Sequence, residues 1–286
     1  MSNVTEWNSA VSAINSGGGN KNYIINITAN FSVPGTTSYN FTPSDLNISI
    51  RGNKTLSLSS NGSLLRINGQ RIIIRDLTLK GRKNGVDGAT SDNDASLIYM
   101  YGTVELKGTA SITGNVLYRN SLSDYANAQR YGGGVDLEGG TFIMWDNSSI
   151  TGNSVITSGT PRSWALGGGI YNYGTLIMRG NSSITNNTAT ANGDSYTQQR
   201  FGFGGGVFVG PGKILRIEGG TISGNTANVK GSALYLFASN GGTDDFGIGN
   251  DNSIAQRGTF SGDTWTSMGN LSTTNSNITV ENGVLK

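Results

Sequence analysis

The middle of the chain is built from a repeat, and a repeat constrains the fold more than any other feature of a sequence. Glycine triplets followed by Val or Ile begin at Gly132, Gly167 and Gly204, and Gly231 begins a related Gly-Ser-Ala-Leu segment. Residues 95–98 form an earlier, degenerate version, so the openings lie 37, 35, 37 and 27 residues apart. Thin units of this kind cannot bury an apolar face alone, and they stack on one another as a solenoid.

Each full unit ends with a second motif of the type Ser-Ile-Thr-Gly-Asn, and the closing residues are Asn115, Asn153, Asn187 and Asn225. Asn tolerates left-handed backbone and bonds neighbouring backbone groups at corners. Stacked corners also bring the amides within reach of one another, so we predict a ladder of asparagine side chains. The glycine triplets recur in register and no helix follows them. We therefore interpret them as tight corners rather than as phosphate-binding loops.

The whole unit, motifs included, contains three short segments of alternating apolar residues. In one unit these are residues 170–173, 176–178 and 183–185. Alternation sends successive side chains to opposite faces of a strand, so stacked units produce three inward columns. The columns are Ile98, Val135, Ile170, Val207 and Leu234; Val104, Phe142, Leu176 and Leu215; and Ile112, Ile150, Ile184 and Ile222.

These patterns predict an all-β fold, a single right-handed parallel β-helix with three short strands per coil. The 44 Gly residues argue against a helical bundle, and a propeller blade would need about four strands. The handedness follows from the crossover preference of parallel strands. One domain is expected over 1–286, with irregular first coils at 20–94, regular repeats at 95–237 and a C-terminal capping region at 238–286.

An N-terminal helix is predicted to cap the first coil within residues 1–19. Apolar residues recur at helical spacing from Trp7 to Ile14, and Thr5 is the expected N-cap. An open solenoid end exposes core and unpaired strand edges, so a cap is needed there. At the far end, residues 277–285 predict a last hairpin or edge strand.

Composition excludes several classes of function. The chain has no Cys and no His, so it lacks a thiol nucleophile, a zinc–thiolate site and a histidine base. No apolar run approaches ~18 residues, and a net charge of +2 is too small for a surface that neutralises phosphates. We therefore expect neither membrane insertion nor nucleic-acid binding. No signal peptide is present in the sequence after Met1, so secretion would use a signal that was removed or another export route.

The repeat motifs resemble those of a known group of proteins. The glycine openings, the segment 219–227 and the leader segments 7–18 and 61–67 resemble spirochaete-type right-handed β-helix surface proteins. The repeats are also similar to those of polymorphic outer-membrane protein passengers, although the Phe-x-x-Asn motif and a translocator barrel are missing. This resemblance implies the pectate-lyase-like superfold and a bacterial protein, secreted or on the cell surface, with an adhesive role. The same superfold hosts pectin-active lyases and hydrolases.

Insertions of varying length follow the asparagine corner at residues 116–131, 154–166 and 188–203. Insertions at one corner stack on one side of a solenoid, often its binding side. These insertions carry Arg and aromatic residues, and the outward positions of the neighbouring first strand are aromatic as well. Aromatic faces stack on sugar rings, and Arg bonds hydroxyls or carboxylates. The predicted ligand-binding residues are Tyr99, Tyr171, Phe208, Tyr235, Trp164, Arg162, Tyr196 and Arg200.

Two interpretations of this aromatic row stay open. The row and the insertions form an open platform for a ligand, or the insertions fold over the row and bury it. Asp136 interrupts the row, and Glu138 interrupts a second outward row that contains Tyr101, Tyr173 and Phe237.

No catalytic residue is predicted. Asp244 and Asp245 are similar to the double Asp of β-helix pectin hydrolases, but those families also use a His-containing motif, and this pair lies in the irregular tail. Asp87, Asp92 and Asp94 form an acidic loop of a kind that can hold Ca²⁺. Their spacing matches no calcium loop, so we interpret them as solvated charge and predict no cofactor. An Arg or Lys base leaves an enzyme open.

The sequence therefore favours a non-catalytic secreted or cell-surface protein that is adhesin-like or binds polysaccharide through the aromatic strand face and the corner loops. Its expected partner is a polysaccharide or a host-surface ligand, and the solenoid ends offer a route to self-association. One alternative is a polysaccharide lyase or glycoside hydrolase acting on uronic-acid polymers. Another is a structural or filament-forming subunit.

Overall fold

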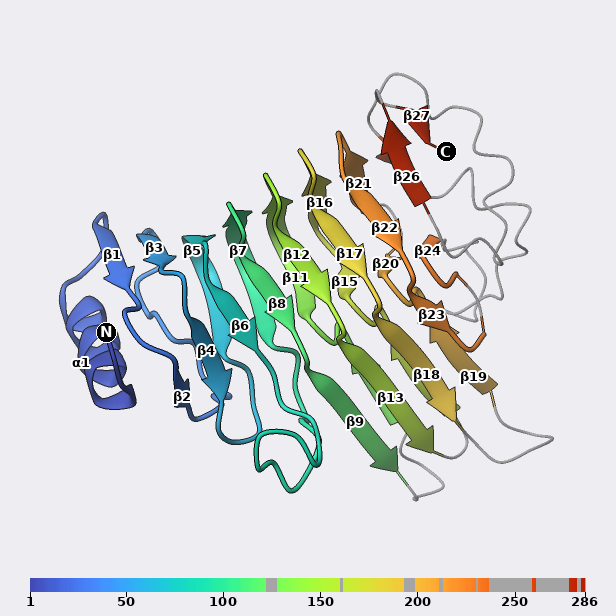
Figure 1. Ribbon diagram of the computed structural model, residues 1–286, viewed down its shortest axis with the longest axis horizontal. Coiled ribbons are helices and arrows are strands. Elements are labelled where there is room, and N and C mark those ends of the chain that lie inside the picture. The colour runs from blue at the N-terminus through green and yellow to red at the C-terminus, as the bar shows by residue number, and fades with distance from the viewer. Residues whose placement is uncertain are drawn as a thin grey trace.

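The computed structural model describes residues 1–121, 128–159, 162–192, 199–210, 213–229 and 231–236, together with the strand segments 259–260, 278–281 and 284–285. The described chain forms a right-handed parallel β-helix that one α-helix precedes (Figure 1). The predicted fold class is confirmed. The coils follow one another in chain order along the long axis of the molecule, from the N-terminal helix toward the red C-terminal strands (Figure 1).

One face of the solenoid is a sheet built from the first and second strands of each coil. The two strands are continuous in the long strands of the middle coils. The first two coils contribute the second strand only, and in later coils the strands separate into two neighbouring rows, all of them parallel. The sheet contains β1 (Asn22–Asn26), β3 (Asn47–Arg51), β5 (Leu65–Arg75), β7 (Ile98–Lys107), β11 (Val135–Met144), β15 (Ile170–Asn172), β16 (Thr175–Met178), β20 (Val207–Val209), β21 (Ile214–Ile217), β24 (Leu234–Leu236) and β25 (Thr259–Phe260).

The third strand of each coil forms a second sheet, which faces the first across the core. Its parallel members are β2 (Phe31–Val33), β4 (Thr55–Leu58), β6 (Thr78–Lys80), β8 (Ser111–Thr113), β12 (Ser149–Thr151), β17 (Ser183–Thr185) and β22 (Thr221–Ser223). At its end lie the antiparallel strands β26 (Ile278–Glu281) and β27 (Val284–Leu285).

The three predicted inward columns form the core. Ile150 pairs in register with Ile112 on one side and with Ile184 on the other, and all three side chains are buried. The same holds for the columns through Ile170 and Leu176. Identical positions of successive coils therefore stack in one continuous core, as the repeat predicts.

The capping helix α1 (Val4–Ser16) buries Trp7 and Ile14 against the first coils. Its N-cap is Asn3, so the prediction of Thr5 is wrong. The extended backbone of Asn3 lets its Oδ1 accept a hydrogen bond from the Glu6 N–H at 3.0 Å, a reach that Thr5 lacks because it already lies in the first helical turn.

The predicted asparagine ladder is present at the corner after the third strand. The Nδ2 of Asn153 donates to Oδ1 of Asn187 at 3.1 Å, and Nδ2 of Asn187 donates to Oδ1 of Asn225 at 3.0 Å. Each amide also donates to a strand carbonyl, as Asn187 does to Ile150 at 3.0 Å. All of these side chains are buried, so the ladder satisfies polar groups that the tight corner would otherwise leave unpaired.

The glycine triplets form the opposite side of the same corner. Gly167 has φ +69°, which favours Gly, and a Cβ on Gly168 would lie 2.4 Å from the carbonyl oxygen of Gly205 in the next coil. The triplets are therefore required by backbone conformation and by the close approach of stacked coils.

The insertions are strands rather than loops, and this is where the sequence interpretation is wrong. Each insertion runs outward on one strand and returns on another, which makes two small parallel sheets that we call the wing (Figure 1). The outer sheet contains β9 (Val116–Ser121), β13 (Ser154–Gly159), β18 (Thr188–Asn192) and β23 (Thr226–Ala227). The inner sheet contains β10 (Ala128–Tyr131), β14 (Arg162–Leu166) and β19 (Gln199–Phe203).

Small side chains fill the space between the two wing sheets. Leu117, Val155 and Ala189 of the outer sheet pack against Ala165 of the inner sheet. Beside them, the Oγ1 of Thr157 and the Oγ of Ser163 are hydrogen-bonded at 2.7 Å across the gap. Short alternating segments of Ala, Ser and Thr thus form strands here because each one stacks on the same segment of the next coil.

Candidate functional site

Most of the predicted aromatic row is covered by the wing. Tyr171, Phe208 and Tyr235 project from the first sheet and form a buried cluster with Trp164 and with Phe201 and Phe203 of the inner wing sheet. On the wing strand β14, Trp164 and Leu166 face this cluster, whereas Ala165 faces the outer wing sheet. The insertions therefore fold over the row in these coils, which was one of the two interpretations of the sequence.

The covered rings form a continuous stack. The ring centroids of Tyr131 and Tyr171 are 4.6 Å apart, those of Tyr171 and Phe208 are 5.3 Å apart, and those of Phe208 and Tyr235 are 5.8 Å apart, all nearly parallel. Such stacks contribute packing free energy beyond the area that they bury. In the described chain, these rings hold the wing against the solenoid.

The other predicted site residues lie apart from that cluster. Tyr99 is half-buried on β7, two coils before Tyr171 in the same column. Arg200 is exposed on β19, and its backbone is in register with Ser163. Arg162 belongs to β14, while Tyr196 lies outside the described residues.

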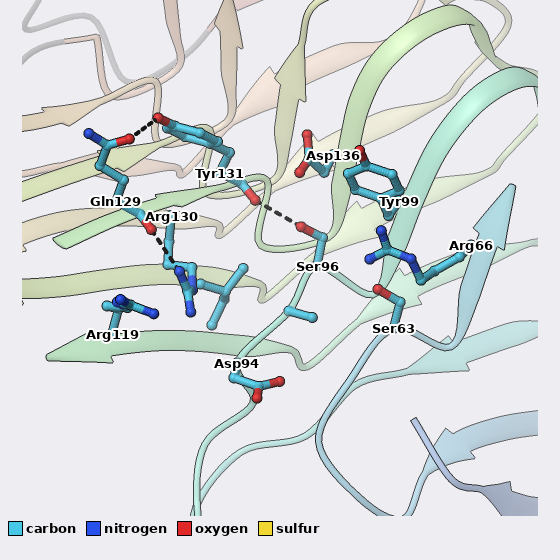
Figure 2. Close-up of a pocket in the computed structure, with 12 residues that line it drawn as sticks. Ser63, Arg66, Asp94, Ser96, Tyr99, Arg119, Gln129, Arg130, Tyr131 and Asp136 are labelled. Carbon is cyan, nitrogen blue, oxygen red and sulfur yellow. Dashed lines mark hydrogen bonds between the residues drawn. The ribbon is translucent and has the colours of Figure 1, made fainter. Parts of the chain in front are cut away.

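An open cleft of about 650 Å³ lies where the wing begins, and of the predicted residues it includes Tyr99 (Figure 2). The preceding coil carries no wing strands in the described chain, so β10 is the first strand of the inner wing sheet. The step between these two coils leaves a concave corner. Its polar and aromatic lining residues are Ser63, Arg66, Asp94, Ser96, Tyr99, Arg119, Gln129, Arg130, Tyr131 and Asp136.

Two arginines mark the first coil of the wing interior. Arg119 on β9 is in register with the buried Thr157, and Arg130 on β10 is in register with the buried Ala165. In the first wing coil, two guanidinium groups therefore occupy the positions that small side chains fill in the next coil. Figure 2 shows these two side chains near one another, with Asp94 below them. Burial, and next the nearby charge of Arg119, lowers the pKa of Arg130.

A third arginine lies on the solenoid side of the cleft. The guanidinium carbon of Arg66 is 3.9 Å from the centroid of the Tyr99 ring, which is close enough for a cation–π contact. Burial raises the pKa of Tyr99, so its hydroxyl stays protonated at neutral pH. The Tyr99 ring and the Arg66 guanidinium therefore form one amphipathic wall of the cleft.

Asp136 occupies the same outward column as Tyr99 and Tyr171, between them. Its side chain is only 8% exposed, and Oδ1 has no hydrogen-bond partner in the described chain. Burial, and then the neighbouring Glu138 carboxylate, raises the pKa of Asp136 well above its ordinary value, against the smaller effect of Arg66. A protonated Asp136 offers the cleft a hydroxyl donor as well as an acceptor.

Buried polar atoms without partners gather around this cleft. They are Ser63 Oγ, Arg66 Nε, Arg119 Nε, Arg130 Nε and Asp136 Oδ1. Buried polar groups in folded proteins are nearly always hydrogen-bonded, and five that line one open cleft call for a ligand or ordered water. This convergence makes the cleft the candidate site.

Metal ligands do not gather in the described residues, where no group of three His, Cys, Asp or Glu side chains is placed to hold an ion. The acidic loop is dispersed: Asp87 forms an ion pair with Lys80, Asp92 Oδ1 accepts from the Asn84 N–H at 2.8 Å, and Asp94 lines the cleft. Asp244 and Asp245 lie outside the described residues.

Sequence reasoning missed Arg66, Arg119, Arg130 and Asp136 as site residues. Connection length gave no signal, because residues 81–97 between β6 and β7 form a connection nearly as long as those that carry the wing. In their sheets the first wing strands β9 and β10 have a strand neighbour on one side only, and this follows from the fold.

A comparison of the chain with known protein families, curated proteins and solved structures finds no match. No helix in the described chain has the length and apolar character needed to cross a membrane.

Proposed function

We propose that this chain is a non-catalytic β-helix protein of the secreted or cell-surface type, and that it binds carbohydrate in the cleft at the first wing coil. One observation carries the proposal: five of the residues that line an open cleft each have a buried polar atom without a hydrogen-bond partner, and Tyr99 lines the same cleft. Carbohydrate sites combine fixed donors and acceptors with aromatic surface. The covered aromatic row then acts as the rigid support of the site, and Tyr99 is the predicted ligand residue that lines the cleft.

The rest of the proposal draws on the repeat motifs. Their resemblance to spirochaete-type β-helix surface proteins and to polymorphic outer-membrane passengers favours an adhesive protein outside the bacterial cell. A solenoid suits this role because it is rigid and presents its side strands at regular spacing. The expected partner is a polysaccharide or a host-surface glycan.

The test is a glycan array probed with the full chain, followed by calorimetric titration of every hit. Tyr99→Ala should weaken binding at least tenfold because it removes one wall of the cleft. Tyr118→Ala is the matched control, since Tyr118 is 40% exposed on β9 and does not line the cleft. Equal loss in both variants, or no glycan hit at all, would contradict the proposal.

A second candidate function is a glycoside hydrolase or polysaccharide lyase acting on uronic-acid polymers, and Asp136 is the observation that favours it. A buried carboxyl group with a raised pKa has the properties of a general acid. Incubation of the chain with pectins and other uronic-acid polymers tests this function by the appearance of reducing ends or of unsaturated product. Turnover that disappears in Asp136→Asn would establish the enzyme and overturn the binding-only proposal.

A further inference from the structure

The two arginines at the open end of the wing face one another across a gap that is filled by small residues elsewhere. In the next coil the corresponding positions are Thr157 and Ala165, both buried. Small side chains are therefore sufficient for the two wing sheets to pack at these positions. Packing of the wing does not explain why the first coil carries Arg119 and Arg130 there.

Two neighbouring guanidinium groups repel one another unless an anion compensates them. Within the described part of the chain, neither Arg119 nor Arg130 forms an ion pair, and the Nε atom of each is buried without a partner. Arg130 donates from Nη1 to the backbone carbonyl of Gln129 at 3.0 Å, which fixes the side chain but does not neutralise it. Asp94, which also lines the cleft, is exposed and lies near enough to Arg130 to support its charge.

We infer that the cleft is specific for acidic glycans, and that Arg119 and Arg130 hold the carboxylate or sulfate group of a sugar residue between them. This inference rests on the proposed function, because it names the class of glycan that the cleft takes. Guanidinium groups match the oxygens of such anions with paired N–H donors. The sugar ring that carries the anion would then lie toward Tyr99 and Ser96.

The surroundings of the pair favour a sugar acid over other anions. The cleft is far larger than a single inorganic ion, and its Tyr99 and Tyr131 rings offer apolar surface to a ring-shaped ligand. A net charge of +2 gives the chain no broad electrostatic attraction for a polyphosphate backbone. Asp136 lines the same cleft, and burial followed by the neighbouring Glu138 carboxylate raises its pKa, which disfavours a negative charge beside the anion.

The experiment is calorimetric titration of the full chain at low salt with three probes: tetragalacturonate, its fully methyl-esterified form and a sulfated galactan tetrasaccharide. The ester has the same backbone without the charge, so we expect it to bind at least tenfold more weakly than the acid. Tighter binding of tetragalacturonate would assign the anion as carboxylate, and tighter binding of the sulfated probe would assign it as sulfate. Affinity for the acidic probes should fall as salt is added.

Variants locate the anion. Arg119→Gln and Arg130→Gln should each weaken the acidic probes at least tenfold and leave the ester unchanged, whereas Arg75→Gln, an exposed arginine outside the cleft, should change neither. If Arg119→Gln lowers the melting temperature, Arg119→Lys replaces it in the titrations, because lysine keeps the positive charge but lacks the paired N–H donors of the guanidinium group.

Equal affinity for the acid and the ester, with binding lost in Tyr99→Ala, would overturn the acidic specificity and leave carbohydrate binding intact. If none of the three probes binds and the glycan array is also empty, both ideas fail. The acid-to-ester ratio of the unmodified chain decides the acidic specificity even if every variant misfolds.

Discussion

The solenoid core and the wing are two stacks made by the same repeat, and they differ in what fills them and in how they end. The core holds columns of Ile, Leu and Val with Phe142 among them, whereas the space between the two wing sheets holds mainly Ala, Ser and Thr beside Leu117 and Val155. Larger apolar side chains remove more area from water, so each coil of the core contributes more stability than each coil of the wing. The core should therefore determine folding, and the wing should depend on the core that it covers.

The core and the wing also differ at their N-terminal ends, and this difference bears on function. The core begins under α1, which buries Trp7 and Ile14 against the first coils. The wing begins without a helix in the described chain. Only the preceding loop pairs with it, through the bridge of Asn93 to Leu117 of β9, and its first coil carries Arg119 and Arg130 where later coils carry small residues. The end of a stack is where side chains can differ from the repeat. In this chain the candidate site lies at that end.

The largest expected effect comes from breaking the core. Ile184→Ala removes three side-chain carbons at a position with no exposed surface, so it should lower the free energy of unfolding by about 2–5 kcal/mol. Thermal and urea unfolding of the whole chain measure this change. Ser183→Ala, one residue earlier on the outward face of β17, is the control and should stay within about 0.5 kcal/mol of the unmodified chain. Similar losses in both variants would show that stacking of the Ile column does not dominate stability.

A smaller effect is expected in the wing. Val155→Ala removes two methyl groups from the buried space between the wing sheets and should cost about 1–3 kcal/mol. If the wing depends on the core, this loss is local: backbone amides of β13 should exchange with solvent faster, while those of β12 keep their protection. Ile156→Ala, on the outward face of the same strand, is the control. Equal acceleration in β12 and β13 would mean that core and wing unfold as one unit.

The same contrast explains what the sequence could predict. Columns such as Ile112, Ile150, Ile184 and Ile222 repeat with one residue type, so their register and burial could be predicted from spacing alone. The wing segments mix Ala, Ser and Thr with polar and aromatic residues, and their weak alternation does not distinguish a strand from a loop. Their strand structure depends on the neighbouring coil, which lies more than 30 residues away.

The candidate site could be predicted only in part. Tyr99 was found because it belongs to the aromatic row, but the same row suggested Tyr171, Phe208 and Tyr235, which the wing covers. Whether an outward ring is open depends on which coil carries a wing, and the motif that places the ring does not contain that information. Arg119 and Arg130 belong to separate strands with six undescribed residues between them, so only the fold brings them to one cleft.

The smallest expected effect lies at the step between the two regions and depends on pH. Burial, followed by the Glu138 carboxylate, raises the pKa of Asp136 in the folded chain above its unfolded value near 3.8. Between these two values the folded state binds more protons than the unfolded state, so the contribution of Asp136 to stability falls as the pH rises through the folded pKa. Asp136→Asn removes this group, and the variant should gain stability relative to the unmodified chain as the pH rises, with little difference near pH 4.

Chemical denaturation of the variant and of the unmodified chain over a pH series measures the difference in their free energies of unfolding. Subtracting one curve from the other removes the contribution of the titratable groups that both chains contain. Asp94→Asn is the control, because Asp94 lines the same cleft but is exposed. Parallel stability curves for Asp136→Asn and the unmodified chain would mean that Asp136 is solvated in the folded state. In that case the wing would begin with an open surface rather than a shaped cleft, and the contrast between a capped core and a wing that ends in a binding site would lose its structural basis.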